Sequence, residues 1–423
     1  MSAGWCVCHS PTMSIVATPQ GREWKGPRMT SARTLHQHDL NARTQVQQLR
    51  SSAIRAVANA AIGTEGVLPF WFGEPDELTP QNIRDVAIQE INDGNVSYVQ
   101  TLGVPSLREA LANYVSRLHR PTSVDQIAVT SSGTAALMTA VQAIVGFDDR
   151  VVVVTPLWPN LVEIPKVMGA RVETVSLDFG PDGWELDTEK LLAALIPDTR
   201  ALLLNSPNNP TGWVMNESQR SAILEHCRER GIWIISDDVY ERYYFAGESS
   251  PSFLDIADAS DRVISCNSFS KTWLMTGWRI GWIVAPEETL PDIGKLLEFS
   301  TTCTPGFVQA AAREALLTGE PTVERTVARL RVARDHLHSE LVKIPGIEVP
   351  APASGAMYSF FRVSEPVESL SFCRDLIEQS GLGLAPGVAF GPEGEGFLRW
   401  CFASETARID DGVNRLRSYM ERK

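Results

Sequence analysis

Short apolar runs alternate with helical stretches through the middle of the chain. The helical stretches include 133–145, 187–196 and 217–230. Between them lie β-branched or apolar runs at 151–155, 201–204, 232–236, 263–266 and 280–285. Runs that are apolar on both faces and separated by helices are typical of a parallel sheet covered on both sides. The pattern therefore predicts an α/β fold with a mostly parallel sheet flanked by helices.

The pattern changes after about residue 305. A helical stretch ending at Thr318 leads into a long charged helix over 323–343, which Pro345-Gly346 ends. A strand over 355–363, a helix near 370–379 and a strand over 396–403 are expected to follow. This order predicts a second, smaller α+β domain.

Four segments follow from these two patterns. Residues 81–310 are expected to form the large domain and 311–423 the small one. The segment 35–80 is expected to pack with the small domain. Residues 1–34 are rich in Ser, Thr, Pro and Gly and are predicted to be a flexible extension. Translation could start at Met13 or Met29 instead of Met1, and the sequence does not decide between them.

Composition excludes several classes of function. The 423 residues are 43% hydrophobic and 21% charged, which suits a globular protein with a large core. The net charge of −13 argues against nucleic acid and against an anionic membrane surface. No apolar run reaches about 18 residues, so no spanning helix is expected. Seven scattered cysteines favour reduced thiols in the cytoplasm, and Cys6 and Cys8 lack a second ligand pair, so no metal is expected.

Polar or aromatic residues follow five predicted strands, of which four are named above and the fifth is a strand-like run over 127–129. The segments are TSSGTAAL (130–137), TPLWPN (155–160), NSPNNPTG (205–212), SDDVY (236–240) and CNSFSKTWLMTGWR (266–279). Ligands of doubly wound sheets bind beyond the carboxyl ends of the strands. We therefore expect these segments to meet at one crevice.

Lys271 is the candidate nucleophile. It follows a strand, among Ser268, Ser270 and Thr272 and beside Trp273. Surroundings that lower its pKa would supply the free amine that a Schiff base requires. The alternative is a lysine that faces solvent.

Asp237 is the candidate partner for a cation. A carboxylate at the end of an apolar strand is costly to bury without positive charge, and a protonated pyridine nitrogen would supply it. The alternatives are a helix N-cap or a structural ion pair, and Asp238 competes for the role.

Small and basic residues predict an anion site. Ser132, Gly133 and Thr134 would present backbone N–H groups and hydroxyls at the start of a helix, which suits a phosphate but also an ordinary N-cap. Arg279 would add a bidentate clamp, and Ser268 and Ser270 would add hydroxyl donors. Trp158 offers a flat face for a planar ring, or simple core packing.

With these residues the chain resembles a known family, the class I/II aminotransferases, which have the fold-type-I scaffold of pyridoxal-phosphate (PLP) enzymes. The resemblance covers about 40–420. SPNNPTG and SFSKTWLMTGWRIGW carry it most specifically, and weaker motifs stand in the family's order: FWFGEPDELTP (70–80), YVQTLGVPSLREAL (98–111), GAMYSFF (355–361), APGVAFG (385–391) and GFLRWCFA (396–403).

The resemblance implies a PLP-dependent aminotransferase that works by a ping-pong mechanism through a Schiff base on Lys271. Rival outcomes on this scaffold are a lyase, a decarboxylase or a cyclase, and, in another class, a regulator that senses ligand. The remaining roles it implies are these: Asp237 on the pyridine nitrogen; Tyr240 and Asn209 on the phenolic oxygen; Ser132, Gly133, Thr134, Ser268 and Arg279 on the phosphate; Trp158 stacked on the ring; Arg399 and Gly73 on the substrate; Tyr98 on the cofactor of the other subunit of a homodimer.

One departure and one gap stand beside the resemblance. The family usually has Asp-Glu where this chain has Asp237-Asp238. No second basic residue that would bind a distal carboxylate is evident. The aromatic residues in or beside motif loops lean toward a bulky or apolar substrate group, although core or interface packing explains them slightly better: Phe70, Trp71, Phe72 and Trp213.

Overall fold

The computed structural model describes residues 41–423, within which Thr44–Lys423 form one compact unit. The expected extension at 1–34 lies outside the described residues, as do both internal starts and the Cys6 and Cys8 pair. None of the helices within the described part is long and apolar enough to cross a membrane.

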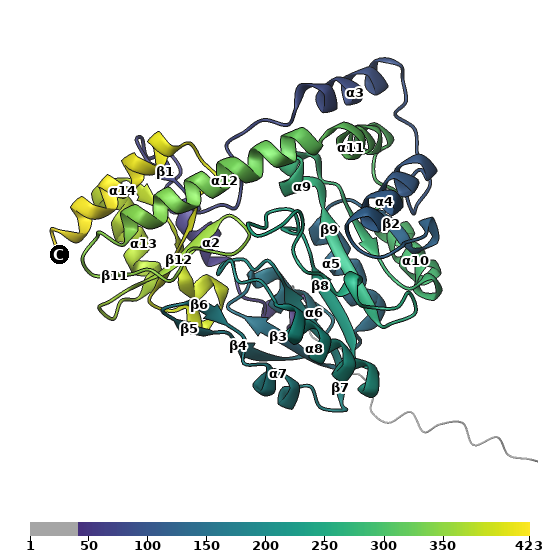
Figure 1. Ribbon diagram of the computed structural model, residues 1–423, viewed down its shortest axis with the longest axis horizontal. Coiled ribbons are helices and arrows are strands. Elements are labelled where there is room, and N and C mark those ends of the chain that lie inside the picture. Colours follow the sequence, from purple (N-terminus) through teal and green to yellow (C-terminus); the bar gives the residue numbers. More distant parts are fainter. Residues whose placement is uncertain (1–40) are drawn as a thin grey trace, which may run out of the picture. The chain divides into compact units, whose positions relative to one another are not determined.

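A seven-stranded sheet forms the centre of this unit and confirms the predicted fold class (Figure 1). Its strands, in spatial order, are β2 (Ile127–Thr130), β10 (Gly281–Val284), β9 (Val263–Ser268), β8 (Trp233–Asp237), β7 (Thr199–Asn205), β3 (Arg150–Thr155) and β4 (Arg171–Ser176). All neighbours pair in parallel except β10, which is antiparallel to both β2 and β9.

Both faces of the sheet are buried because successive strand residues point to opposite sides. Val151 and Val153 of β3 pack in one apolar cluster, and Val152 and Val154 pack in another. The covering helices are α5 (Gly133–Ile144), α6 (Pro159–Val167) and α10 (Leu290–Ser300) on one face, and α7 (Thr188–Ala194) and α8 (Glu217–Arg230) on the other.

Local signals set the ends of these helices. In α8, Asn216 accepts a hydrogen bond from the backbone N–H of Gln219, whose side chain bonds back, and this capping box starts the helix. Gly231 ends it in the left-handed region at φ 66°, where a residue without Cβ is favoured. The helix occupies the predicted range.

A third apolar cluster lies at the β2 edge of the sheet. It joins Ile127 and Val129 of β2 and Trp282 of β10 to helices on that side. Those helices are α3 (Gln81–Asn92), α4 (Pro105–Leu118), α9 (Phe269–Thr272) and α11 (Gly306–Thr318).

The C-terminal part forms a separate antiparallel sheet with its own helices. The strands, in spatial order, are β11 (Ile347–Glu348), β12 (Tyr358–Val363), β15 (Phe397–Cys401) and β14 (Ala385–Pro386). The helices are α12 (Glu320–Leu341), α13 (Ser369–Ser380) and α14 (Thr406–Met420). In Figure 1 the long α12 runs from α11 toward the yellow C-terminal elements. It begins three residues before the predicted start because Pro321 is well suited to a first turn.

The segment before residue 80 contacts the C-terminal part. Its elements are α1 (Thr44–Gln47), α2 (Ala53–Ala60) and β1 (Leu68–Pro69), and β1 pairs in parallel with β13 (Leu382–Gly383). A small hairpin, β5 (Asp178–Gly180) with β6 (Gly183–Glu185), packs its Trp184 on Phe360 of β12. One apolar cluster therefore runs from the large sheet to the small one, and the domain boundaries at 80 and 310 stay a prediction.

Candidate active site

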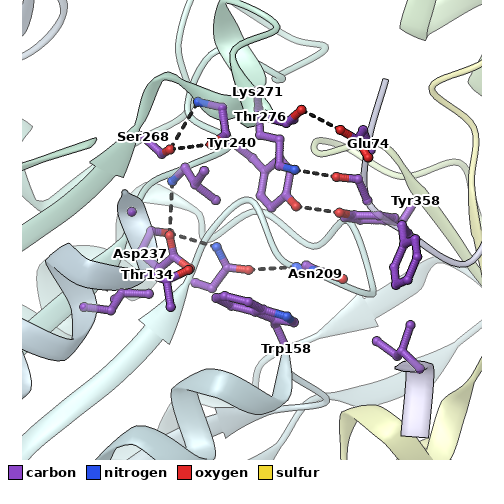
Figure 2. Close-up of a pocket in the computed structure, with 18 of the residues that line it drawn as sticks. Glu74, Thr134, Trp158, Asn209, Asp237, Tyr240, Ser268, Lys271, Thr276 and Tyr358 are labelled. Carbon is purple, nitrogen blue, oxygen red and sulfur yellow. Dashed lines mark hydrogen bonds between the residues drawn. The ribbon is translucent and has the colours of Figure 1, made fainter. Parts of the chain in front are cut away.

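A cavity of about 510 Å³ lies at the carboxyl ends of the parallel strands. Asn205 ends β7, Asp237 ends β8 and Ser268 ends β9, and all three line it. Asn205 and Asp237 are direct partners across β7 and β8, and the Asn205 side-chain amide donates to the Asp237 carbonyl at 2.8 Å. Segments after β2 and β3 also contribute lining residues. Figure 2 shows Lys271, Asp237, Asn209 and Trp158 converging on this space.

Lys271 extends from the short helix α9 directly after β9. Its Nζ donates to the carbonyl of Gly73. Burial lowers the pKa of Lys271 to about 8, and the nearby charges of Arg399 and Arg279 act in the same direction. An amine with this pKa is about one-tenth unprotonated at pH 7, far more than an ordinary lysine. The side chain faces the cavity, so the solvent-facing alternative is wrong.

Asp237 is a carboxylate buried at the end of β8. Only 5% of the residue is exposed, and the carboxylate accepts one hydrogen bond, at 3.3 Å from the backbone N–H of Val239. Burial raises the pKa of Asp237 to about 7, and the neighbouring charge of Asp238 adds to the rise. Within residues 41–423 the carboxylate forms no ion pair. A cationic ligand group in the cavity would remove this penalty.

Asp238 turns away from the cavity. Its carboxylate accepts from the Ser236 hydroxyl at 2.6 Å, from the Ser265 hydroxyl, and from Ser252 at 3.4 Å. Burial raises the pKa of Asp238 to about 6, against the opposing effect of the serine hydroxyls. The opposite orientation of two neighbouring acids follows from the alternation of side chains at the end of a strand.

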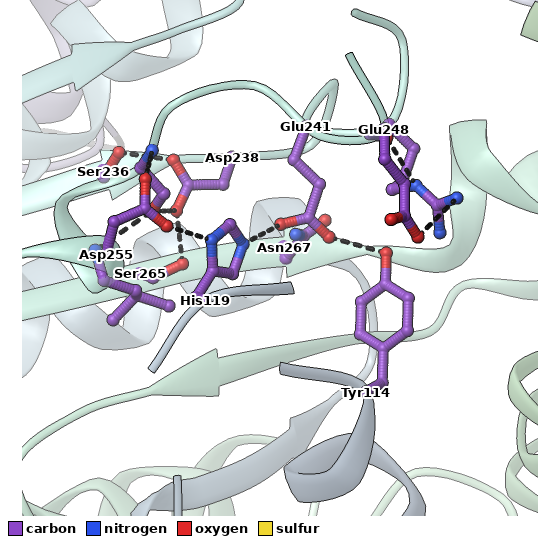
Figure 3. A network of polar contacts seen from close by, with 12 residues as sticks. Tyr114, His119, Ser236, Asp238, Glu241, Glu248, Asp255, Ser265 and Asn267 are labelled. Atoms are coloured by element: carbon purple, nitrogen blue, oxygen red, sulfur yellow. Dashed lines mark hydrogen bonds and ion pairs between the residues drawn. The ribbon is translucent and has the colours of Figure 1, made fainter. Parts of the chain in front are cut away.

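A buried polar network lies behind this strand end (Figure 3). His119 Nδ1 lies 2.6 Å from Asp255, and Nε2 lies 3.2 Å from Glu241. Tyr114 donates its hydroxyl to the second oxygen of Glu241 at 2.8 Å. Although burial alone would lower the pKa of His119, the two carboxylates outweigh burial and raise it to about 10. His119 is therefore an imidazolium that ties the C-terminal end of α4 to the loop after β8.

The N-terminus of α5 and the turn after α9 form an anion-binding end of the cavity. Ser132 accepts from the backbone N–H of Ala135 at 3.0 Å and holds a strained φ of 141°. A Cβ at Gly133 would lie 2.9 Å from the Cβ of Ser268, so only glycine fits this approach. Arg279, at φ 53°, is exposed beside the cavity. Backbone N–H groups, hydroxyls and a guanidinium are the donors that a phosphate prefers.

Arg399 comes from β15 of the small sheet and is 2% exposed. It donates to the Asn209 side-chain oxygen at 3.0 Å and to the carbonyl of Trp71. Its guanidinium carbon lies 4.4 Å from the ring centre of Tyr358. The Nε atom has no hydrogen-bond partner, and within the described chain no carboxylate contacts this cation. A buried guanidinium in this state is a site for a carboxylate ligand.

Two tyrosine side chains also line the cavity. Tyr240 and Tyr358 share a hydrogen bond of 2.5 Å. Burial raises the pKa of Tyr240 well above its ordinary range. Both hydroxyls therefore stay protonated and able to donate at neutral pH.

Most of the predicted site residues share this cavity: Gly73, Gly133, Thr134, Trp158, Asn209, Asp237, Tyr240, Ser268, Ser270, Lys271, Arg279 and Arg399. Two do not line it. The Ser132 hydroxyl is used as the helix cap. Tyr98 is 87% exposed and lines a different hollow.

Several lining residues were not predicted: Ile54, Arg55, Glu74, Asn205, Thr276 and Tyr358. Four of these, Glu74, Asn205, Thr276 and Tyr358, lie inside the motifs quoted above, so their position in a motif could have identified them as site residues. Ile54 and Arg55 lie in none of those motifs. Of the noted aromatic residues, Trp71 and Phe72 line the cavity, whereas Phe70 packs on Trp400 and Trp213 lies in the core.

Comparison with known proteins agrees with this fold. The family profile described as aminotransferase class I and II matches residues 65–416. The chain belongs to this family. It is 31% identical to an aspartate aminotransferase of Thermotoga maritima over 84% of this chain and 92% of that protein. It is 34% identical to a probable aspartate/prephenate aminotransferase of Aquifex aeolicus, over 84% and 91% of the two chains. The solved structure of a Thermus thermophilus aspartate aminotransferase mutant superposes with a TM-score of 0.83 at 30% identity, over 89% of this chain and 99% of that one.

The His119 network generates a prediction about stability. Because the pKa of His119 is raised on folding, its stabilising contribution is complete below about pH 6.5 and is lost as the pH rises toward 10. We expect His119→Gln to lower the free energy of unfolding by about 3 kcal/mol at pH 6.5, since the buried carboxylate of Glu241 loses its cation, whereas the more exposed Asp255 keeps its ion pair with Arg220. The difference from the unmodified protein should shrink at pH 10. Urea unfolding at both pH values measures it.

His338→Gln, on the half-buried surface of α12, is the control for the loss of an imidazole. It should change stability by less than about 0.5 kcal/mol. A His119→Gln deficit that is the same at both pH values would contradict an imidazolium at this position.

Proposed function

We propose that this protein is a PLP-dependent aminotransferase that transfers an amino group from an L-amino acid to a 2-oxo acid. One observation carries the proposal. A single cavity contains an amine of lowered pKa, Lys271, together with a buried carboxylate, Asp237, and a buried guanidinium, Arg399, neither of which forms an ion pair within the described residues. A cationic ring would neutralise the carboxylate, a substrate carboxylate would neutralise the guanidinium, and the amine faces the same space. Family membership supports the same activity.

The residues around the cavity fit the cofactor. Asp237 would pair with the ring nitrogen, and Trp158 would lie against the ring. Tyr240 and Asn209 would bind the phenolic oxygen. The phosphate would bind at the start of α5 and at the turn after α9, through Ser132, Gly133, Thr134, Ser268, Ser270 and Arg279. The test of fit is the Asp237 carboxylate, which forms no ion pair within the described residues, together with the start of α5, where a Cβ at Gly133 would lie 2.9 Å from the Cβ of Ser268 and leave the backbone less accessible to an anion.

Bound here, PLP supplies a positively charged ring that accepts the electron pair left on the substrate when its α-proton is removed. Lys271 Nζ would hold the cofactor until the substrate binds. Its free amine would then take the α-proton of the substrate and return it to the cofactor. Since burial lowers its pKa to about 8, this amine both accepts and gives up a proton near neutral pH.

Asp237 and Arg399 prepare the site for this transfer. The Asp237 carboxylate would keep the ring nitrogen protonated, and the charge-assisted bond would in turn keep the carboxylate ionised. Arg399 would bind the substrate α-carboxylate. Asn209, whose side-chain oxygen accepts a hydrogen bond from Arg399, would help to bind the same carboxylate. Holding the α-carboxylate orients the α-proton toward Lys271.

We also propose a homodimer in the cytoplasm in which Tyr98 reaches the cofactor of the second subunit. The ring of Tyr98 is exposed and lines no part of the cavity of its own chain, which supports a partner beyond it. The scattered cysteines, five of which are free within the described part, support a reducing compartment.

The test of the proposed function is a half-reaction. PLP-loaded protein mixed with one L-amino acid and no acceptor should release one equivalent of the matching 2-oxo acid. Lys271→Ala should slow this step by about 10²–10⁴-fold, because the proton has no acceptor. Stopped-flow absorbance and product analysis measure both quantities.

Lys295→Ala, which removes an exposed lysine of α10, is the matched control and should keep the normal rate. A full rate in Lys271→Ala would refute its role. Release of carbon dioxide, or of ammonia with pyruvate, in place of the simple oxo acid would assign the protein to decarboxylation or elimination.

Arg399→Ala should weaken the binding of every amino acid substrate by about 30-fold or more, because the α-carboxylate loses a buried, hydrogen-bonded cation. The saturable dependence of the half-reaction on amino acid concentration measures this affinity. Arg331→Ala, at an exposed position of α12, controls for the loss of an arginine. Equal substrate affinity in Arg399→Ala and the unmodified protein would exclude this assignment.

A further inference from the structure

One short segment of the cavity wall contacts three cationic groups in succession. The carbonyl of Trp71 accepts from Arg399, and the carbonyl of Gly73 accepts from Lys271. Between them, the ring of Phe72 lies under the guanidinium of Arg55, whose central carbon is 6.0 Å from the ring centre. Consecutive Cα atoms are about 3.8 Å apart, so all three cations gather beside a segment only three residues long.

This arrangement fixes which part of a substrate would face Arg55. An α-carboxylate at Arg399 and an α-carbon at Lys271 leave the substrate side chain against the remaining wall. That wall includes Ile54, Trp71 and Phe72, with the guanidinium of Arg55 at its edge. A side chain with a short apolar stem and an anionic end matches this combination of surfaces.

No interaction within the described residues explains why a positively charged side chain stands at position 55. Within residues 41–423 its guanidinium forms neither an ion pair nor a hydrogen bond, and its stacking on Phe72 is its one contact of a cation with a ring. It stands in the first turn of α2, whose N-cap is Ser52. A positive charge at this end opposes the helix macrodipole, so the arginine does not stabilise the helix electrostatically.

An acidic side chain near this wall already has a hydrogen-bond partner. Glu74 also lines the cavity, and its carboxylate accepts from the Thr276 hydroxyl at 2.5 Å. It does not pair with Arg55. A negative charge at Glu74 would oppose an anionic substrate, which makes a compensating cation at the same wall more necessary.

We infer that Arg55 is a specificity-determining residue that binds the distal carboxylate of a dicarboxylic amino acid or 2-oxo acid. The inference rests on the proposed function and names its substrate class. Because the residue is exposed and lies on a short helix, its guanidinium can leave the ring of Phe72 and form a bidentate pair with the substrate. Substrates without a distal charge would still bind against the apolar wall, but without this pair.

Two unreactive ligands isolate the distal carboxylate. Glutarate and pentanoate have five carbons each and differ only at the far end. Their binding to the PLP-loaded protein is followed by the change in cofactor absorbance. We expect glutarate to bind about 10-fold or more tightly than pentanoate, and Arg55→Gln to abolish this preference while leaving pentanoate affinity unchanged. Arg55→Lys should restore part of it, because it restores the charge without the fork.

The half-reaction gives the same comparison with reacting substrates. Arg55→Gln should lower the efficiency of L-glutamate and L-aspartate by about 10-fold or more and leave L-phenylalanine unchanged. Arg50→Gln, an exposed arginine just before α2, is the matched control and should change neither class. The result distinguishes a specificity residue from a structural one, which would affect both classes equally.

Two outcomes overturn the inference: a glutarate preference that survives in Arg55→Gln, or an equal loss for glutarate and pentanoate. Neither touches the proposed function, which fails separately if the unmodified protein releases no 2-oxo acid from any amino donor. The unmodified protein could also convert L-phenylalanine while Arg55→Gln reacts with every amino donor at the same efficiency. That result would support the proposed function and overturn only the inference about Arg55.

Discussion

The carboxylate of Asp237 lies at the buried end of a central strand and forms no ion pair within the described chain. Burial of such a group costs several kcal/mol unless a partner arrives or a proton is bound. This cost of burial is why the pKa of Asp237 is raised to about 7. The carboxylate of the neighbouring Asp238 accepts hydrogen bonds from serine hydroxyls, which oppose the rise of its pKa on burial. The site is therefore built to be completed by a cationic ligand group, and the rest of the cavity is arranged around that requirement.

The topology of the sheet explains why the complementary groups meet here. Parallel β7, β8 and β9 end at one edge, so Asn205, Asp237 and Ser268 stand side by side, and Lys271 follows three residues after Ser268. The small sheet then supplies Arg399 from the opposite side. Cation, anion and amine thus come from separate elements. Burial favours the free amine of Lys271, whereas the Asp237 carboxylate needs a cationic ligand group to stay ionised.

Much of the fold was predictable, because an apolar run such as that of β8 has one stable environment in a sheet covered on both faces. The direction of β10 was not, since a strand buried on both faces has the same pattern in either direction. The edge strand β4 was missed because its charged and partly exposed residues hide the alternation. Residues in specific motifs, such as Lys271, were predicted to be in the site. Arg55 was not, because it reaches the cavity only through the folding of α2 against Phe72, which no local pattern records.

The central claim is that the Asp237 carboxylate holds a proton on the ring nitrogen of bound PLP. The most direct measurement is the ¹⁵N chemical shift of ring-labelled PLP bound to the protein, at neutral and mildly alkaline pH. We predict the shift of a protonated nitrogen in the unmodified protein and in Asp238→Asn, and the shift of an unprotonated nitrogen in Asp237→Ala. An unprotonated nitrogen in the unmodified protein, or a protonated one in Asp237→Ala, would contradict the account.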